Sequence, residues 1–317
     1  MTTPIRLGII GFGIMGERLL RAALEHAGEF VTPSGVWDPS SAAAARLAAV
    51  AGAPAMLGSA EAVIAGCDCL YVAAPPAAHV PLAEAALAAG KAVFLEKPLA
   101  TDLAAARALV AASAGARAAV NFPMASSPAV AQLVAWKEGL TPQSLAIEVA
   151  FATWPRPWQQ DAAGWLARRA EGGFTREVVS HFLFLTRRML GPLALQDASA
   201  CYPEGDGAES AITARLTAGG LPVSLTGGVG ITTKDDHNCW TLDGAIRLRD
   251  WSFAERAGAD GLWAQAADAL PNEKMRPMVL RGQLQAVAAM TRGEAHHLAT
   301  LSEALEVQEI VEAILKA

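Results

Sequence analysis

Glu96-Lys97-Pro98 is the first of two segments whose residue types could carry out acid–base chemistry. It follows Lys91-Ala92-Val93-Phe94-Leu95, which we predict to be a strand. A proline ring crowds the backbone before it, so we expect Lys97 to avoid the helical region and to stand extended at the strand's end. Ligands of open α/β sheets bind beyond the carboxyl ends of the strands, which predicts that the Lys97 ammonium faces a ligand. The alternative is an ordinary surface lysine before a loop proline.

The second segment is 172–181, in which Gly172-Gly173 precede Glu177 and His181. On a helix, residues four apart project from one face, where a carboxylate can orient an imidazole. An imidazole with a pKa of about 6.5 exchanges protons at neutral pH. The two glycines would let the backbone approach a bound ligand closely. The alternative is a histidine packed on a mainly apolar helix after an ordinary loop.

A glycine fingerprint, Gly11-Phe12-Gly13-Ile14-Met15-Gly16, follows the apolar run Ile5–Ile10 and leads into the helical pattern 17–24. Strand, glycine turn and helix therefore come in the order that a dinucleotide site requires. Gly11 would allow the tight turn, Gly13 the approach of a pyrophosphate, and Gly16 close packing of helix on strand. The amides of the helix N-terminus would then bind the phosphates. We expect these six residues to bind a dinucleotide.

Asp38 predicts which dinucleotide is bound. It follows the strand-like segment 31–37, about 20 residues beyond the fingerprint, where a carboxylate holds a ribose diol. A carboxylate there accepts hydrogen bonds from NAD and repels the 2′-phosphate of NADP. Ser40 and Ser41 follow, and no cation comes before Arg46. We therefore expect NAD, with NADP as the alternative because the serines can also bind a phosphate.

Composition excludes several classes of protein. The net charge of −6 is opposite to the basic surface that nucleic-acid binding needs. No apolar stretch reaches the roughly 20 residues that span a bilayer, and the first strand begins too early to leave room for a signal peptide. The four cysteines lack the spacing of a zinc site or a disulfide framework. We expect a cytoplasmic protein with reduced thiols, no metal, and a small-molecule substrate.

The pattern of predicted strands and helices changes along the chain, which predicts two domains. Up to residue 121, strand-like runs alternate with alanine-rich helical stretches, which indicates an α/β Rossmann domain with a parallel doubly wound sheet. From residue 144, strand-like runs are separated by glycine-rich turns and mostly lack crossover helices, which indicates an α+β domain with a large, mostly antiparallel open sheet. The predicted strands are 5–10, 31–37, 69–73, 92–96 and 118–122, then 145–153, 195–201, 210–216, 223–230, 240–242 and 245–248.

The predicted domains are 1–121 for dinucleotide binding and 122–317 for substrate binding and oligomerisation. Within the second domain the stretch 174–190 is predicted to be helical. A closing helix over Leu301–Leu315 carries apolar residues on one face and could pack back on the first domain.

A tryptophan-rich segment in the second domain offers a further set of candidate groups. Trp154, Trp158 and Trp165 could stack on a sugar ring or a planar substrate, and Arg156 could bind a carboxylate or phosphate in bidentate fashion. The alternative is a proline-fixed loop whose tryptophans pack against the body of the domain.

Taken together, these motifs resemble the glucose-fructose oxidoreductase and inositol dehydrogenase family (Gfo/Idh/MocA) over essentially the full length of the chain. The resemblance rests on the glycine fingerprint, on 73–79, on 90–100 with its Glu96-Lys97-Pro98, on Gly172-Gly173 with His181, and on the closing helix. It implies a Rossmann domain that binds NAD(P), an open-sheet domain, substrate between the two, and subunits joined through sheet faces as a dimer or tetramer.

The resemblance also implies roles for individual residues. Lys97 and His181 act near the nicotinamide, and Glu177 assists the histidine. Cofactor contacts extend to Ala74, Pro75, His79 and Glu96, although His79 could equally cap the following helix. The residues that the resemblance and the segment chemistry mark as substrate contacts are Asn121, Trp154, Arg156, Trp158, Trp165 and Arg176.

The expected reaction transfers hydride between nicotinamide C4 and a small polyhydroxylated or cyclic alcohol or ketone, with Lys97 and His181 moving the hydroxyl proton. The sequence departs from the family where Glu177 replaces the usual aspartate and Val179 a glycine, and where Arg176 stands at a commonly apolar position. The family also has an arginine a few residues after the strand that ends at 121–122, and in this sequence the region of Pro123 and Met124 stands in its place. These departures reshape the expected pocket and keep two alternatives open: imine reduction on the same scaffold, and a non-catalytic NAD(P)-binding regulator.

Overall fold

A computed structural model of the chain describes residues 3–317 and divides them into two compact units. The first unit contains the described residues up to Ser126 together with Arg276–Leu305. The second contains Ser127–Met275 and Glu306–Ala317. The chain therefore leaves the first unit, builds most of the second, returns to the first, and ends in the second.

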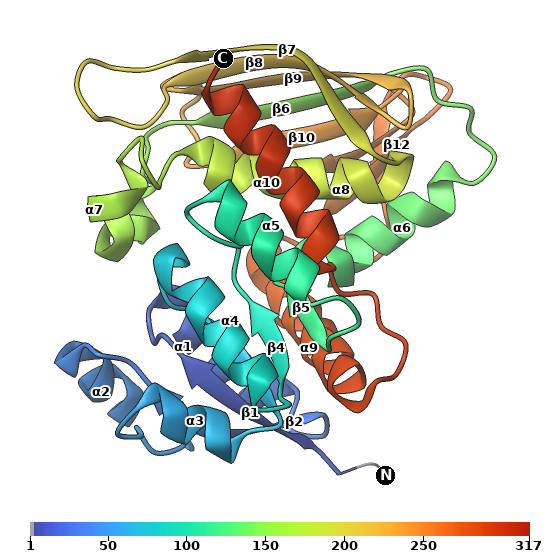
Figure 1. Ribbon diagram of the computed structural model, residues 1–317. Coiled ribbons are helices and arrows are strands. Elements are labelled where there is room, and N and C mark those ends of the chain that lie inside the picture. The colour runs from blue at the N-terminus through green and yellow to red at the C-terminus, as the bar shows by residue number, and fades with distance from the viewer. Residues whose placement is uncertain (1–2) are drawn as a thin grey trace. The chain divides into compact units, whose positions relative to one another are not determined.

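The first unit is built on a five-stranded parallel sheet with the strand order β2-β1-β3-β4-β5. Helices connect successive strands, so the doubly wound Rossmann architecture predicted from the alternating pattern is confirmed (Figure 1). The strands are β1 (Ile5–Ile10), β2 (Val31–Trp37), β3 (Cys69–Val72), β4 (Ala92–Leu95) and β5 (Ala118–Val120). The helices are α1 (Ile14–His26), α2 (Ser41–Ala48), α3 (Ala60–Gly66), α4 (His79–Ala88), α5 (Leu103–Ala112) and most of α9 (Asn272–Arg292).

The central strands of this sheet are buried on both faces, as their unbroken apolar composition predicts. All four residues of β3 and all four of β4 are buried. On one face, Tyr71 and Phe94 stack with ring centroids 5.5 Å apart. They share a core with Leu20 of α1 and Leu284 of α9. This packing fixes the carboxyl ends of β3 and β4, from which candidate site residues extend.

The second unit is built on an eight-stranded sheet with the strand order β13-β12-β11-β10-β6-β9-β8-β7. Every pairing is antiparallel except that of β6 with β9, which confirms the predicted large and mostly antiparallel sheet. The strands are β6 (Leu145–Phe151), β7 (Leu193–Cys201), β8 (Ala211–Ala218), β9 (Leu221–Val229), β10 (His237–Leu242), β11 (Ile246–Arg249), β12 (Phe253–Ala257) and β13 (Trp263–Gln265). The helices α6 (Pro128–Lys137) and α8 (Ser180–Leu190) pack against this sheet (Figure 1).

Several predicted elements differ from the structure. The strands predicted at 92–96 and 118–122 end at Leu95 and Val120, and the side chains of Glu96 and Asn121, just beyond these ends, bond to each other. The helix predicted over 174–190 begins as the π-helical turn η4 (Thr175–Val179) and becomes α-helical at Ser180.

The strands β12 and β13, at one end of the sheet order, and the long helix α9 were absent from the predicted set. Both strands are short and rich in polar residues, and α9 contains Pro277, which breaks a helical pattern in the sequence. The closing helix α10 (Leu301–Leu315) has the predicted bounds. Among residues 3–317, no helix combines the length and the apolar character that crossing a bilayer requires.

Candidate active site

The glycine turn between β1 and α1 has a shape that requires glycine at two positions and leaves open space at the third. Gly11 has a φ of +92°, and a Cβ there would lie 2.4 Å from backbone atoms of Ala73 and Ala74. A Cβ on Gly16 would lie 2.0 Å from the Gly11 carbonyl oxygen. A Cβ on Gly13 would meet nothing within 4 Å, so there is open space next to this residue. Gly13 is also the N-cap of α1 and offers no side-chain cap, which suits a pyrophosphate.

Asp38 is tied to this glycine turn. It follows β2, and its Oδ2 accepts a hydrogen bond from the Phe12 amide at 2.7 Å while its Oδ1 accepts one from the Ser40 amide at 2.8 Å. The Arg46 guanidinium donates to the Phe12 carbonyl at 2.6 Å. A carboxylate and a guanidinium thus both reach Phe12, and this donor and acceptor set fits the adenosine end of a dinucleotide.

His79 joins the loops that follow β3 and β4. It is fully buried at the start of α4, with Nε2 2.9 Å from the Ala74 carbonyl oxygen and Nδ1 2.8 Å from the Pro98 carbonyl oxygen. Burial lowers the pKa of this imidazole, although the contacts with the Ala74 and Pro98 carbonyls oppose this shift. His79 therefore fixes the segment that contains Pro75 to the segment that contains Lys97, and its ring contacts these two carbonyls instead of the first amides of α4.

Lys97 is half-buried directly beyond the end of β4, where the Lys97-Pro98 peptide bond is cis. The side chain of the preceding Glu96 is buried and takes part in a polar chain across the sheet. Glu96 Oε1 accepts hydrogen bonds from the Tyr71 hydroxyl and, at 2.6 Å, from Asn121 Nδ2. Gln283 Nε2 in turn donates to Asn121 Oδ1 at 2.6 Å. The segment that presents Lys97 is thus anchored to β3, β5 and α9.

The same chain of contacts clarifies the roles of Glu96 and Asn121. Burial, and then the neighbouring Glu96 carboxylate, raise the pKa of Tyr71 far above its usual range, so the phenol stays protonated and donates. Asn121 is only 1% exposed and uses both ends of its amide within the network. The structure therefore gives Asn121 and Glu96 an anchoring function. Sequence reasoning missed Tyr71 and Gln283, although a tyrosine within the otherwise apolar β3 was a signal.

In the second unit, Gly172 and Gly173 allow close contacts at the start of the helix that carries Glu177 and His181. A Cβ on Gly172 would lie 2.2 Å from the Leu166 carbonyl oxygen, and one on Gly173 would lie 2.1 Å from Glu209 Oε2. Glu209 is 2% exposed, and its Oε1 accepts a hydrogen bond from the Thr175 amide at 2.7 Å. Burial raises the pKa of the Glu209 carboxyl. The glycines therefore make room for an internal acid at this helix start.

Glu177 and His181 lie in helical segments of different type, the first π-helical and the second α-helical. Glu177 is half-buried in the π-helical turn η4, whereas His181 lies in the first turn of α8 and is 8% exposed. The wider π-helical turn changes the four-residue alignment that a regular α-helix would give, and π-helical turns frequently occur at functional sites. The His181 ring packs edge-to-face against Trp251, with centroids 5.3 Å apart and planes at 74°.

The tryptophan-rich segment is held mainly by internal contacts. Arg156 is 6% exposed and forms an ion pair with Asp236 at 2.5 Å. Its guanidinium lies 4.7 Å from the Trp158 ring centroid and 5.4 Å from that of Trp154. Trp154 donates its indole N–H to the Leu166 carbonyl at 3.0 Å. These contacts match the packed-loop alternative for Trp154 and Arg156.

The remaining candidate substrate residues divide into exposed and paired groups. Trp158 and Trp165 expose 48% and 36% of their surface, and the Trp158 ring also lies against the Arg156 guanidinium. Arg176 forms a two-fold ion pair with Glu312, at 2.6 and 2.9 Å, and also donates to the Arg169 and Gly172 carbonyls. Arg176 therefore links the helix start to α10 within the second unit.

Comparison with known proteins agrees with this geometry. Residues 5–122 match the family described as GFO_IDH_MocA, "Oxidoreductase family, NAD-binding Rossmann fold". The inositol 2-dehydrogenase of Cereibacter sphaeroides is 42% identical over 109 residues, which are 34% of this chain and 32% of that protein. The matched part of the chain thus spans about a third of the length of the curated relatives.

Solved structures resemble the whole chain. An oxidoreductase from Thermotoga maritima has a TM-score of 0.80 at 19% identity, covering 99% of this chain and 96% of that one. An oxidoreductase from Agrobacterium radiobacter, solved with NAD+, L-tartaric acid and magnesium, has a TM-score of 0.80 at 17% identity with the same coverage of 99% and 96%. These likenesses show that the complete two-unit fold is shared.

The predicted resemblance is confirmed by the match of the Rossmann unit, by the inositol dehydrogenase relatives and by the shared fold. In this unit the glycine turn leaves open space at Gly13, and Asp38 accepts a hydrogen bond from the Phe12 amide. Residues 5–122 of this chain match the Gfo/Idh/MocA oxidoreductase family in its NAD-binding Rossmann fold, and the whole chain shares the two-unit fold of solved oxidoreductases.

Proposed function

We propose that this protein is an NAD-dependent dehydrogenase that transfers hydride between nicotinamide C4 and a small polyhydroxylated or cyclic alcohol or ketone. The observation that carries the proposal is Lys97, a half-buried lysine fixed directly beyond the end of β4 in an NAD-binding Rossmann unit. Ligands of such sheets bind at this edge. The buried contacts of Glu96 and His79 hold the lysine's segment in place.

Lys97 and His181 would divide the proton chemistry. When the carbinol is oxidised, hydride leaves its carbon for the oxidised nicotinamide and the hydroxyl proton must go to a base. The Lys97 ammonium stabilises the negative charge that develops on the oxygen, and His181 accepts and relays the proton. Glu177 orients the imidazole. In the reverse direction the same groups return the proton to the carbonyl oxygen.

A cyclic polyol is the substrate class that the comparisons favour. The curated relatives are inositol 2-dehydrogenases, and their similarity lies in the Rossmann unit. The exposed Trp158 and Trp165 of the second unit offer apolar ring faces on which the C–H face of a sugar-like ring could stack. The second unit carries the departures at Glu177 and Val179, so the substrate can differ from inositol while the reaction class stays the same.

NAD is the proposed cofactor in preference to NADP. Asp38 stands beside the glycine turn as a carboxylate that accepts from the Phe12 and Ser40 amides, and a phosphate placed next to it would be repelled. Arg46 donates to the Phe12 carbonyl and is a neighbouring cation that would favour NADP. Comparing turnover with the two cofactors at equal concentration tests the preference, and a clear preference for NADP would refute it.

The test of the function is NADH formation from a panel of cyclitols, sugars, diols and imines, measured for the wild type, Lys97→Ala and His181→Asn. We expect turnover of a polyol and a loss of about a hundredfold or more in kcat for Lys97→Ala, with NAD binding retained. Lys91→Ala is the matched control, because Lys91 is also half-buried but lies before β4 and donates to the Cys67 carbonyl. It should keep wild-type kcat.

Two outcomes would overturn this function. Near-native turnover by Lys97→Ala with intact NAD binding would remove the lysine from the chemistry. NAD binding without turnover of any compound in the panel would favour a non-catalytic regulator, and turnover of imines alone would favour imine reduction.

The proposed assembly is a homo-oligomer joined through the face of the eight-stranded sheet opposite α6 and α8. Family resemblance is the basis of this proposal. The strands β7 and β8 carry exposed, oppositely charged side chains, such as the paired Asp197 and Arg215. Sedimentation should give a dimer or tetramer, and a mass equal to one chain would contradict it.

The cytoplasm is the proposed compartment. Cys67, Cys69 and Cys239 are buried free thiols, and Cys201 is an exposed one, as in proteins kept reduced. Fractionation of the source cells should recover the protein in the cytosolic fraction, and recovery outside it would contradict the assignment.

A further inference from the structure

The turn between β11 and β12 holds a tryptophan in an unfavourable backbone conformation. Asp250 and Trp251 both have positive φ, at 46° and 72°. Asparagine or aspartate followed by glycine is the usual choice where two consecutive turn residues have positive φ. Asp250 follows that preference, but a bulky side chain replaces the glycine at 251. Such a conformation is unfavourable for a bulky residue and persists only where the surroundings fix it.

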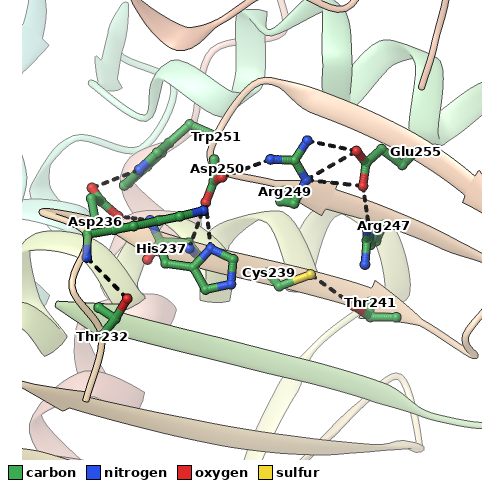
Figure 2. Close-up of polar contacts among 12 residues, drawn as sticks. Thr232, Asp236, His237, Cys239, Thr241, Arg247, Arg249, Asp250, Trp251 and Glu255 are labelled. Atoms are coloured by element: carbon green, nitrogen blue, oxygen red, sulfur yellow. Dashed lines mark hydrogen bonds and ion pairs between the residues drawn. The ribbon is translucent and has the colours of Figure 1, made fainter. Parts of the chain in front are cut away.

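The surroundings of Trp251 fix its indole through a set of buried and half-buried charges (Figure 2). The Trp251 indole N–H donates to Asp236 Oδ2 at 3.1 Å, and Arg156 binds the same oxygen at 2.5 Å. Asp250 Oδ1 accepts from the Asn238 amide at 3.2 Å and lies 3.1 Å from His237 Nδ1. The turn and the ring are therefore held from β10 and from the segment that contains Arg156.

The anchored Trp251 ring packs against α8, the helix that carries His181. The Trp251 ring contacts His181 edge-to-face at 5.3 Å and contacts Phe182 at 5.2 Å with planes at 46°. His181 is 8% exposed, whereas Trp251 is half-buried. An aromatic neighbour at this distance favours one orientation of the imidazole and so restricts its rotation.

We propose that Trp251 is a positioning residue that holds the His181 imidazole in the orientation needed for proton transfer, with Asp236 and Arg156 fixing the indole. This inference rests on the proposed function, in which His181 relays the proton. It explains why a strained tryptophan occupies a turn position that glycine would adopt at lower cost. It also assigns a role to the Arg156–Asp236 ion pair, which holds the Trp251 indole in place.

The test is a double-mutant cycle of Trp251→Leu with His181→Asn, using the best polyol substrate of the panel. Trp251→Leu should lower kcat by about tenfold, because small misplacements of a catalytic group have effects of this size, while KM and NAD affinity stay within about twofold. In the His181→Asn background the same change should have almost no further effect on kcat. Trp251→Phe keeps an aromatic ring but loses the bond to Asp236, so its kcat should lie between those of Trp251→Leu and the wild type.

A control variant and an NMR measurement distinguish a specific effect on His181 from a general effect of removing a tryptophan. Trp263→Leu removes a half-buried tryptophan that packs on Arg247, 4.1 Å from its ring centroid, and should keep wild-type kcat. In histidine-labelled protein, Trp251→Leu should also shift the His181 ring resonance, which can be assigned because it disappears in His181→Asn.

Each adverse outcome contradicts one claim. Full activity of His181→Asn, or no turnover by the wild type, overturns the proposed function. Equal losses from Trp251→Leu in both backgrounds would show a role independent of His181 and overturn the positioning role. An unchanged His181 resonance in Trp251→Leu would overturn it without any substrate.

Discussion

At the scale of single residues, the side chains that could react are few, and most of the polar groups around them serve to hold them. Lys97 and His181 are the proposed reacting groups. Tyr71, Asn121 and Gln283 are buried and bonded in a chain that ends on Glu96, the residue before Lys97. Leaving any member of such a buried network without its partner costs about 1–3 kcal/mol. The network therefore resists displacement of the lysine's segment.

His79 provides a residue-scale prediction of pH dependence. Its pKa in the folded protein is lowered, chiefly by burial, relative to about 6.5 in an unfolded chain. Because the unfolded chain binds a proton more readily, stability is fully present above pH of about 6.5 and is lost as the pH falls toward the folded pKa. Thermal unfolding should therefore show a fall in Tm over this range that is weaker in His79→Gln.

The control for this measurement is His26→Gln, which changes an exposed histidine at the end of α1. It should retain the pH dependence of the wild type. An identical pH dependence in His79→Gln would show that the buried imidazole does not contribute to acid destabilisation.

At the scale of elements, the glycine turn before α1 makes separable predictions for stability and cofactor binding. Gly13→Ala places a methyl group in open space, so Tm should change little, while NAD affinity should fall about tenfold or more because the methyl group occupies the approach of the pyrophosphate. Gly16→Ala places a methyl group 2.0 Å from the Gly11 carbonyl oxygen and should lower both Tm and NAD affinity.

Gly28→Ala is the control for the glycine turn, since a Cβ at this exposed residue meets nothing within 4 Å. Calorimetric titration with NAD and thermal unfolding measure the two properties. Unchanged NAD affinity in Gly13→Ala would mean that the cofactor does not pass over this residue.

The start of the helix that carries His181 gives a second element-scale prediction. Burial raises the folded pKa of Glu209, so its contribution to stability is fully present below the unfolded pKa of about 4.5 and is lost as the pH rises through the folded value. Glu209→Gln keeps an oxygen for the Thr175 amide and removes the ionisation. The Tm of this variant relative to the wild type should therefore increase from acid to neutral pH, as measured by calorimetry. A constant difference across that range would contradict the buried, ionising acid.

The elements that carry the strongest local patterns were predictable, and those that depend on distant contacts were not. The strand, glycine turn and helix around Gly11 follow from adjacent residues, as do the α/β alternation and the position of Lys97. Glu209 and Trp251 lie far along the chain from the helix they contact, and their environment arises only when β8, β11 and β12 pair in the sheet. The helix α9 was hidden because Pro277 and many polar residues interrupt its pattern.

At the scale of the whole molecule, the chain crosses between its two units more than once, so binding at the first unit can stabilise a substantial part of the fold. NAD at about 100 times its Kd should stabilise the native protein by about 2.7 kcal/mol, measured as a rise in Tm. NADP at the same concentration should give a smaller rise in Tm, because the Asp38 carboxylate would repel its 2′-phosphate. Equal rises with the two cofactors would contradict the proposed selectivity.

The account depends most on the claim that hydride passes from a carbinol carbon of a polyol to nicotinamide C4. The direct measurement is to incubate the protein with NAD and a substrate polyol deuterated at its carbinol carbons and to examine the NADH by NMR and mass spectrometry. We predict one deuterium at C4 of the NADH and a rate slower than with the undeuterated polyol. NADH without deuterium at C4, or no NADH from any polyol, would contradict the proposed reaction.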